Sequence, residues 1–175
     1  MKLNRSNFYN IIKKIQTFEN NPYFGVAVSG GPDSMCLLNL LHEYCKLING
    51  NLIAIIVNHN LRSESSKEAL LVSNLLNKKN IKTKILNVKS AYVIKKNMKE
   101  ARNNRYRLLT NFCRKNNIIH LFVGHHYDDN IETFVNRKIA GSDFDGLQAM
   151  NYISIRDKIC IIRPLLDFTK KQILK

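Results

Sequence analysis

The sequence predicts an α/β protein built on a doubly wound parallel sheet of five strands, a Rossmann-like arrangement. Short apolar runs rich in β-branched residues recur along the chain, and each is followed by a segment with the apolar period of a helix. Strands that are apolar on both faces are typical of a parallel sheet covered by helices on both sides. The strands are expected at residues 23–29, 51–59, 82–88, 118–126 and 158–166.

Helices are expected after the first four of these strands. Near the N-terminus, Phe8, Ile11, Ile12 and Ile15 share one face of a leading amphipathic helix expected within residues 1–22. The helices that follow the strands are expected at residues 34–48, 66–79, 97–116 and 127–140.

Two other stretches complete the expected organisation. Residues 141–157 are the longest part of the chain without clear periodicity, and we interpret them as an active-site loop. Thr169 is a suitable N-cap for a helix that the last residues begin. No internal repeat, proline-rich linker or low-complexity tract divides the chain, so residues 23–175 are expected to form one domain.

The chain is strongly basic. It has 28 lysine and arginine residues against 13 aspartate and glutamate residues, a formal net charge of +15. This excess is larger than solubility requires and indicates a polyanionic partner, with nucleic acid as the first candidate. The alternative is compositional, because lysine, asparagine and isoleucine are all abundant, as they are in proteins from AT-rich genomes.

The cysteine pattern fits a reducing, cytosolic setting. Cys36, Cys45, Cys113 and Cys160 are far apart, with no CxxC pair and no histidine at zinc-finger spacing. No apolar run approaches the roughly 20 residues that span a bilayer. We expect a cytoplasmic protein without a membrane partner, in a bacterial cytosol or, if the chain is organelle-encoded, an organelle stroma. The oligomeric state is left open, a homodimer included.

The stretch "SGGPDS" stands where the first expected strand passes into the next helix. Glycines let the backbone turn with positive φ and approach a ligand closely, and a helix N-terminus offers unpaired N–H groups to phosphate oxygens. The carboxylate of Asp33 is an oxygen ligand of the kind that Mg²⁺ takes. The alternative is a glycine turn that serves strand-to-helix geometry alone. We expect a phosphate cradle made of Ser29, Gly30, Gly31, Pro32, Asp33 and Ser34.

This glycine loop has neither the Walker pattern GxxxxGKS/T nor the Rossmann pattern GxGxxG, so ordinary phosphoryl transfer and dinucleotide binding are not favoured. It resembles instead the signature of the N-type ATP pyrophosphatases, the PP-loop ATPases of the adenine nucleotide alpha hydrolase fold. The resemblance implies an enzyme that cleaves ATP between its α and β phosphates and activates a substrate as an adenylate.

Four further stretches resemble, in order and spacing, the successive motifs of the tRNA(Ile)-lysidine synthase family. The resemblance runs from about residue 23 to the end of the chain. It implies the strand order 3-2-1-4-5, which leaves a ligand crevice between strands one and four at their carboxyl ends. The stretches are "VNHNLRSESSKEA" (57–69), "KEARNNRYRLL" (99–109), "GHHYDDNIETFVNRKIAGSDFDGLQAM" (124–150) and "IIRPLLDFTKKQI" (161–173).

An acidic face is expected in "GHHYDDNIET". Asp128 and Glu132 are four residues apart and Asp129 and Glu132 are three apart, so all three can share one side of a short helix. Such a face suits Mg²⁺ or the ammonium groups of free lysine, and His125 or His126 is placed to reach a phosphate or the reacting base. The alternative is that the acids cap the helix and satisfy its N-terminal dipole.

A basic cluster is expected in "KEARNNRYRLL". Arg102, Arg105 and Tyr106 lie on one side of the expected helix, an arrangement that suits gripping a phosphate and stacking a base. A plain solvated basic face is the alternative for Arg107 and Lys99.

His59 and Arg62 follow the second expected strand and resemble nucleotide-side positions of the family motif "VDHGLR". The chain departs from the family in this motif and in the later glycine-rich loop. Asn58 stands where an aspartate is usual, and Asn60 and Asp143 stand where glycines are usual.

The family resemblance implies a two-step ligation that changes a tRNA from methionine to isoleucine specificity. ATP adenylates the wobble cytidine of tRNA(Ile) with a CAU anticodon, and L-lysine then displaces AMP. The implied catalytic residues are Asp33, Arg105 and His125, with Asp33 also steering Mg²⁺ and pyrophosphate. Arg102, Arg105 and Tyr106 would contact the tRNA, and the acidic face would recognise lysine. The resemblance also implies tRNA-recognition domains downstream, which we expect to be absent or truncated.

Other functions are compatible with parts of the pattern. A tRNA thiolation enzyme on the same scaffold also adenylates a base, but such enzymes usually carry paired cysteines. An amidotransferase module resembling GMP or NAD synthetase shares the cradle but does not account for the basic excess or for "GHHYDDNIET". A tRNA-binding remnant without catalysis is the alternative from a different class.

Overall fold

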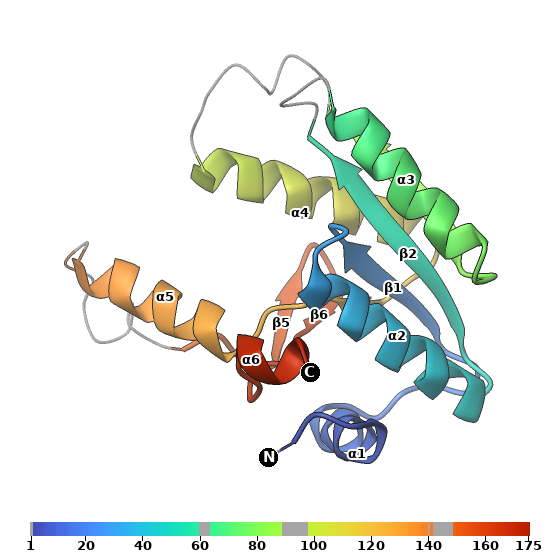
Figure 1. The fold of residues 1–175 in the computed structure, drawn as a ribbon, viewed down its shortest axis with the longest axis horizontal. Helices are drawn as coiled ribbons and strands as arrows, with labels where there is room; N and C mark the ends of the chain where they lie inside the picture. Colours follow the sequence, from blue (N-terminus) through green and yellow to red (C-terminus); the bar gives the residue numbers. More distant parts are fainter. Residues whose placement is uncertain (1, 60–63, 89–97, 140, 142–148) are drawn as a thin grey trace.

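The protein has a six-stranded sheet with helices on both faces (Figure 1). The computed structural model describes residues 2–59, 64–88, 98–139, 141 and 149–175. The strand order is β3-β2-β1-β4-β6-β5, and all neighbouring strands are parallel except β5 and β6. The parallel strands confirm the predicted doubly wound α/β fold. They are β1 Tyr23–Val28, β2 Asn51–Asn58, β3 Lys82–Asn87, β4 His120–Phe122 and β6 Ile159–Ile162.

The sixth strand, β5 (Ile153–Arg156), corrects the sequence-based prediction of a loop at residues 141–157. Asp157 and Lys158 form the two-residue turn between β5 and β6, and both have positive φ, 51° and 65°. Tight hairpin turns of this kind are usually signalled by Asn-Gly or Asp-Gly. An Asp-Lys pair carries no such signal, so the antiparallel edge strand could not be recognised.

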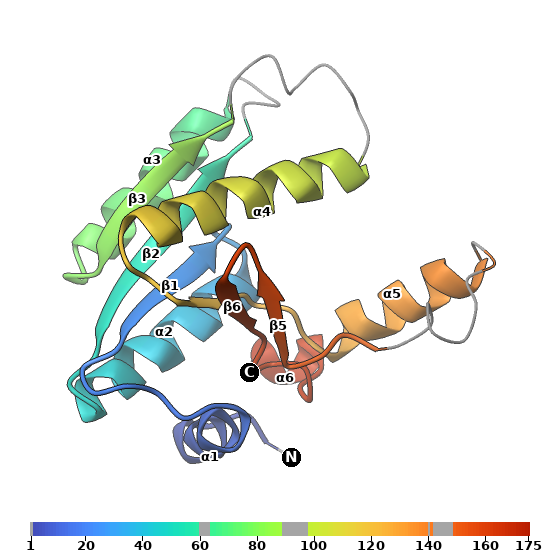
Figure 2. The same cartoon turned by 180° about the vertical axis from the view of Figure 1, so that it is seen from behind.

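The helices form two layers around the sheet (Figure 2). Phe8 of α1, Leu41 of α2 and Leu76 of α3 are fully buried in one hydrophobic core, which confirms the leading amphipathic helix. On the other face, Leu109 and Cys113 of α4 are buried against β2 and β4. No helix within the described ranges is long and apolar enough to cross a membrane. The helices are α1 Arg5–Ile15, α2 Pro32–Leu47, α3 Ser65–Asn77, α4 Met98–Lys115, α5 Tyr127–Ile139 and α6 Lys170–Ile173.

The last helix, α6, begins at the predicted N-cap. Thr169 precedes its first residue, and the Thr169 N–H donates to Gln172 Oε1 at 2.8 Å, one half of a capping box. The short helix is therefore fixed at its start, and this start lies beside the first turn of α5 because the Tyr127 N–H donates to the Phe168 carbonyl at 2.9 Å.

Two glycines are required by the geometry around the start of α2. Gly30 has a φ of +85°, and an added Cβ would lie 2.8 Å from Val72 Cγ2. Gly124, just after β4, would place a Cβ 3.2 Å from the backbone of Ser34. The end of β4 therefore packs directly against the first turn of α2, with no room for a side chain between them.

We expect Gly30→Ala to destabilise the protein and Gly31→Ala to leave it close to wild type. Alanine at position 30 must adopt positive φ, at a cost of roughly 1–2 kcal/mol, and must also displace Val72. At Gly31 φ is −73°, and an added Cβ meets only Ser29 Oγ, at an ordinary 3.5 Å. Urea denaturation gives the free energy of unfolding of each variant. Equal stability of the two variants would show that the positive-φ turn is not needed.

Candidate active site

A cavity of about 590 Å³ lies at the carboxyl ends of the parallel strands. It is located where β1 is flanked by β2 and β4, the switch point at which open α/β sheets bind ligands. Two other cavities, of about 530 and 710 Å³, lie near the amino ends and contain none of the predicted site residues. The polar residues lining the first cavity include Ser29, Asp33, Ser34, Asn58, His59, Arg105, Tyr106, His125 and Asp129.

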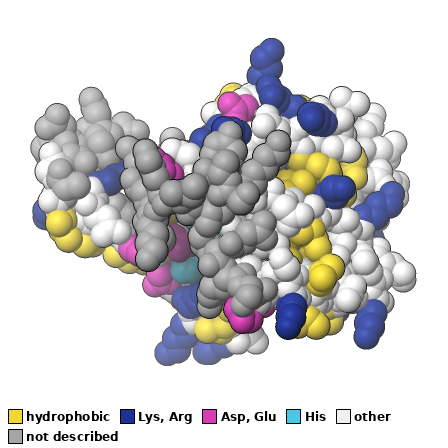
Figure 3. Space-filling view, turned by 90° about the horizontal axis from the view of Figure 1, so that it is seen from above, with side chains coloured by type: hydrophobic (Ala, Val, Ile, Leu, Met, Phe, Trp, Pro, Cys, Tyr) yellow, Lys and Arg dark blue, Asp and Glu magenta, His cyan; other side chains and the backbone are white. Residues whose placement is uncertain are grey.

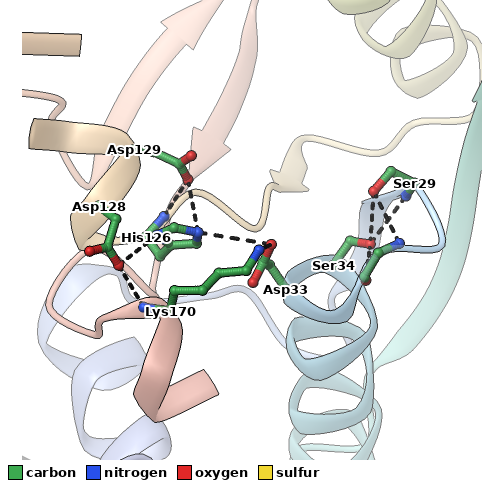
Figure 4. A network of polar contacts seen from close by, with 8 residues as sticks. Ser29, Asp33, Ser34, His126, Asp128, Asp129 and Lys170 are labelled. Carbon is green, nitrogen blue, oxygen red and sulfur yellow. Dashed lines mark hydrogen bonds and ion pairs between the residues drawn. The ribbon is translucent and has the colours of Figure 1, made fainter. Parts of the chain in front are cut away.

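The "SGGPDS" loop is shaped by Ser34. The Ser34 hydroxyl is buried, donates to the Gly31 carbonyl at 3.0 Å and accepts from the Ser29 N–H at 3.2 Å. Ser29 is exposed, and its own hydroxyl lies 3.2 Å from Ser34 Oγ (Figure 4). Gly31 is the N-cap of α2, and Pro32 is its first residue, a position that tolerates a missing N–H. Ser34 thus organises the loop, while Ser29 presents a hydroxyl to the cavity.

Three carboxylates surround a buried histidine beside this loop. His126 is 5% exposed, and its ring nitrogens lie 3.8 Å from Asp33, 3.5 Å from Asp128 and 3.7 Å from Asp129. Asp33 also forms an ion pair with Lys170, whose Nζ lies 2.6 Å from Asp33 Oδ2 (Figure 4). The first turns of α2, α5 and α6 therefore meet at a single polar cluster.

Asp129 caps its own helix, α5, as the capping interpretation predicted, whereas Asp128 caps the neighbouring helix α6. Asp129 Oδ2 accepts from the His126 N–H at 2.9 Å, and Asp128 Oδ2 accepts from the Lys170 N–H at 2.6 Å. The two side chains point to different neighbours, since Asp129 lines the cavity and Asp128 faces α6. Glu132, one turn further along α5, is exposed. Glu132 therefore is the member of the predicted acidic face with the greatest freedom to meet a ligand.

Figure 3 looks at this end of the sheet and shows acidic side chains and a histidine gathered together, with lysine and arginine side chains spread around the rim. The acids thus form a local negative region within a protein whose net charge is +15. A region of this kind favours a cationic group of a ligand or a metal ion over a bare anion.

Three guanidinium groups lie around the ring of Tyr106, which lines the cavity together with Arg105. The Cζ atoms of Arg102, Arg105 and Arg156 lie 5.9, 5.6 and 5.1 Å from the centre of the Tyr106 ring. Arg102, Arg105 and Tyr106 share one side of α4, as predicted. Tyr106 is only 3% exposed, so it supports the arginines instead of offering an open face for stacking. Arg156 comes from β5 and was not predicted.

The histidines that line the cavity are held neutral. Burial, followed by the charges of Arg163, Arg102 and Arg105, lowers the pKa of His125 to about 3. Burial, followed by Arg105, lowers the pKa of His59. A general acid or base works best with a pKa near the operating pH. The catalytic role of His125 stays a prediction, and its chemistry is that of a neutral hydrogen-bonding group.

Asn58, which replaces the usual aspartate of the family motif, forms hydrogen bonds that link neighbouring elements of the fold. It is 4% exposed, and its amide donates to Ser66 Oγ at 2.9 Å and to Asn87 Oδ1 at 3.1 Å. These bonds join the end of β2 to the start of α3 and to the end of β3. The predicted contacts of Arg62, and the departures at Asn60 and Asp143, lie outside the described residues.

Lys170 and Arg156 are the site residues that sequence reasoning missed. Lys170 is part of the "IIRPLLDFTKKQI" stretch, so its motif was recognised, but its contact with a loop 137 residues earlier could not be read from the chain. Arg156 belongs to the strand that lacked a turn signal. Both were missed because their placement depends on how β6 and its neighbours pack.

We expect the ring of His125 to stay neutral at mildly acidic pH. In the unfolded chain it takes up a proton near the ordinary pKa of 6.5, and in the folded protein only near 3. Stability from the neutral ring is therefore present above pH 6.5 and is lost as the pH falls toward 3. Because asparagine does not titrate, His125→Asn should lose less unfolding free energy than wild type as the pH falls below about 6.5, the ordinary histidine pKa. An NMR titration of His125 near pH 6.5 would contradict this.

The parallel sheet and the glycine-containing loop at its switch point define a nucleotide-binding α/β domain. A profile of the PP-loop domain family matches residues 4–175, and the chain belongs to this family. The resemblance of the "SGGPDS" loop to the PP-loop signature is thereby confirmed.

Similar curated proteins carry the name that the motif order predicted. The tRNA(Ile)-lysidine synthase of Wolbachia pipientis wMel is 42% identical over 177 residues, which cover 96% of this chain and 39% of the relative. The tRNA(Ile)-lysidine synthase of Orientia tsutsugamushi (strain Boryong) is 35% identical over 169 residues, 97% of this chain and 38% of the relative. The chain thus spans about two fifths of the length of these relatives.

Two solved structures share the fold. The U34-tRNA thiolase NcsA from Methanococcus maripaludis has a TM-score of 0.79 at 23% identity, over 97% of this chain and 61% of the thiolase. The NH3-dependent NAD synthetase from Campylobacter jejuni has a TM-score of 0.55 at 15% identity, over 96% of this chain and 67% of the synthetase. Identities this low show the fold alone, which confirms the fold class.

Proposed function

We propose that this chain is the ATP-dependent ligase domain that joins L-lysine to the wobble cytidine of tRNA(Ile) with a CAU anticodon, in the cytosol. The main observation in support is that the "SGGPDS" and "GHHYDD" stretches line one cavity, between the carboxyl ends of β1 and β4. Relatives named tRNA(Ile)-lysidine synthase, 35% and 42% identical over nearly the whole chain, support the choice of substrates.

The first step adenylates the tRNA. The carbon-2 oxygen of the cytidine bonds to the α-phosphorus of ATP, and the bond to the bridging oxygen breaks, so that its electron pair leaves with pyrophosphate. Ser29, which lines the cavity, and the backbone N–H groups at the start of α2 are proposed to hold phosphate oxygens. Positioning and charge stabilisation are the protein's contribution to this step.

Asp33 fits a magnesium ion bound to the phosphates. Its Oδ2 pairs with Lys170, whereas its Oδ1 is buried and has no hydrogen-bond partner among the described residues. Within the same residues, no group of three or more His, Cys, Asp or Glu could hold a metal by itself. Mg²⁺ usually takes one or two carboxylate oxygens and completes its shell with substrate phosphates and water. With ATP bound, the ion would neutralise charge on pyrophosphate.

The second step transfers lysine. The ε-amine loses a proton and attacks carbon 2 of the cytidine, the bond from carbon 2 to the adenylate oxygen breaks, and AMP leaves. Asp129 lines the cavity and Glu132 is exposed one turn further along α5, and the two carboxylates are proposed to hold the ammonium group that does not react. Asp128 supports this face through its bond to α6.

The arginines around Tyr106 are proposed to contact the tRNA. Arg102, Arg105 and Arg156 converge on one ring, and guanidinium groups suit phosphate oxygens because they donate in a planar fork. Burial, followed by the charges of Arg163, Arg102 and Arg105, lowers the pKa of His125, so two of the three arginines around Tyr106 add positive charge near that residue.

A tRNA thiolase is the second candidate, because the thiolase NcsA shares the fold with a TM-score of 0.79. Sulfur transfer needs reactive thiolates. Cys45 and Cys113 are buried in the core, and burial raises the pKa of each thiol to about 12. Cys36 and Cys160 come from different elements, α2 and β6, and the pKa of each is also raised by burial. The cysteines therefore favour ligation over thiolation.

We expect the chain to release pyrophosphate from ATP only when tRNA(Ile) with a CAU anticodon is present, and Asp33→Ala to abolish the release. Asp33 is the acid of the loop, and its loss removes the proposed magnesium ligand. A pyrophosphate-release assay, with mass spectrometry of the tRNA nucleosides, measures both the first step and the product.

The same assay separates the candidate functions. Ligation yields a cytidine heavier by lysine, whereas thiolation yields a sulfur-containing nucleoside and a binding remnant yields neither. A folded Asp33→Ala protein with normal turnover would remove the assignment of Asp33. The thermal unfolding midpoint of the variant establishes that it is folded.

We expect Glu132→Gln to impair the second step more than the first. The variant keeps the size of the side chain but loses the charge that would hold an ammonium group, so the KM for lysine should rise by roughly tenfold. Adenylated tRNA should accumulate when lysine is limiting, and excess lysine should restore part of the activity. Product formation is followed by nucleoside mass spectrometry.

Glu43→Gln is the matched control, because Glu43 lies on α2 and pairs with Lys46 away from the cavity. It should leave both steps unchanged. If Glu132→Gln instead stops pyrophosphate release at saturating ATP and tRNA, the acidic face serves ATP or magnesium, and lysine must be recognised elsewhere.

A further inference from the structure

Lys170, at the start of α6, brings a positive charge to the "SGGPDS" loop. Its Nζ lies 2.6 Å from Asp33 Oδ2, and no other lysine or arginine within the described ranges forms an ion pair with Asp33. The loop itself has no counterpart of the Walker lysine. A cation at the phosphate end of the cavity therefore has to come from another part of the chain, and α6 provides it.

The backbone of Lys170 is fixed, while its ammonium group is not. The Lys170 N–H donates to Asp128 Oδ2 at 2.6 Å, and the capping box of Thr169 and Gln172 holds the same turn. The side chain, by contrast, is 45% exposed, and its ion pair within the described part of the chain is the one with Asp33. A partly exposed pair of this kind is weak, and a four-carbon stem allows the ammonium to change partners without moving the helix.

Binding of a metal ion and phosphates at Asp33 would favour movement of the Lys170 ammonium group from the carboxylate to the phosphates. Asp33 Oδ1, which has no hydrogen-bond partner among the residues that the structure describes, is the oxygen proposed to meet Mg²⁺. A divalent ion on this carboxylate would repel an ammonium held 2.6 Å from the other oxygen. The phosphates that arrive with the ion offer the ammonium several anionic oxygens in place of one carboxylate oxygen.

We propose that Lys170 is the cationic residue of the pyrophosphate subsite: it rests on Asp33 in the ligand-free protein and moves to the β- and γ-phosphates when magnesium and nucleotide bind. As the bond from the α-phosphorus to the bridging oxygen breaks, the electron pair and its negative charge go to pyrophosphate. The Lys170 ammonium stabilises that charge, and no proton or further reactant is required. The inference rests on the proposed function only in that ATP is split into AMP and pyrophosphate.

Binding of magnesium pyrophosphate and of AMP to the full 175-residue chain, measured by calorimetry, tests the proposal. Lys170→Met should weaken pyrophosphate binding by roughly tenfold or more, the range for one lost charge-assisted hydrogen bond, and should leave AMP binding unchanged. Lys170→Arg keeps the charge and should retain most of the pyrophosphate affinity. Lys171→Met removes the same charge from the neighbouring exposed position of α6 and should bind both ligands like wild type.

Two outcomes would overturn the proposal. Equal pyrophosphate affinity in Lys170→Met and Lys171→Met would show that Lys170 does not contact the phosphates. Loss of AMP and pyrophosphate binding together in Lys170→Met, with Lys170→Arg equally impaired, would show that the lysine only maintains the structure of the site. Neither assay contains tRNA or lysine, so a failure of the proposed ligation would leave this result intact.

Discussion

The parallel pairing of β1 with β4 is the contact on which the site depends. Phe24, Gly25 and Val26 of β1 lie opposite His120, Leu121 and Phe122 of β4, so that both strands end at the same edge of the sheet. Gly124 follows β4 without a side chain, and the backbone of Ser34 occupies the space that a Cβ would fill. The loop before α2 and the segment after β4 are far apart in the sequence, and this contact holds them together. The cavity forms between them.

Acids in a phosphate site need an explanation, because carboxylates repel phosphate oxygens. In this protein one oxygen of each acid is used within the structure. Asp128 and Asp129 accept backbone N–H groups at the starts of α6 and α5, and Asp33 pairs with Lys170. Bonds of this kind spread the negative charge over helix N-termini, where it is favourable. The cluster can therefore stand beside a nucleotide and still offer oxygens to a metal ion or an ammonium group.

The two sides of the cavity have opposite electrostatic character. Asp33 lies at the start of α2 and Asp128 and Asp129 lie at the start of α5, whereas Arg102, Arg105 and Arg156 surround Tyr106 on the side of α4 and β5. Such a separation suits the proposed ligation, because the arginines attract RNA phosphates and the carboxylates attract an ammonium group or a metal ion. The neutral His125, whose pKa burial and the arginines lower to about 3, also lines this cavity.

Much of the fold could be predicted from sequence because periodicity and turn chemistry act between residues close in the chain. The strands, the helices, the Thr169 cap and the glycine loop are local features of this kind, and the structure confirms them. The hairpin of β5 and β6 is local too, but its Asp157–Lys158 turn has positive φ without a glycine, so the usual signal was missing. Asp33 was recognised from its loop, whereas its partner Lys170 was not. That pair joins positions 137 residues apart, and only the packing of α6 beside α2 and α5 brings them within reach.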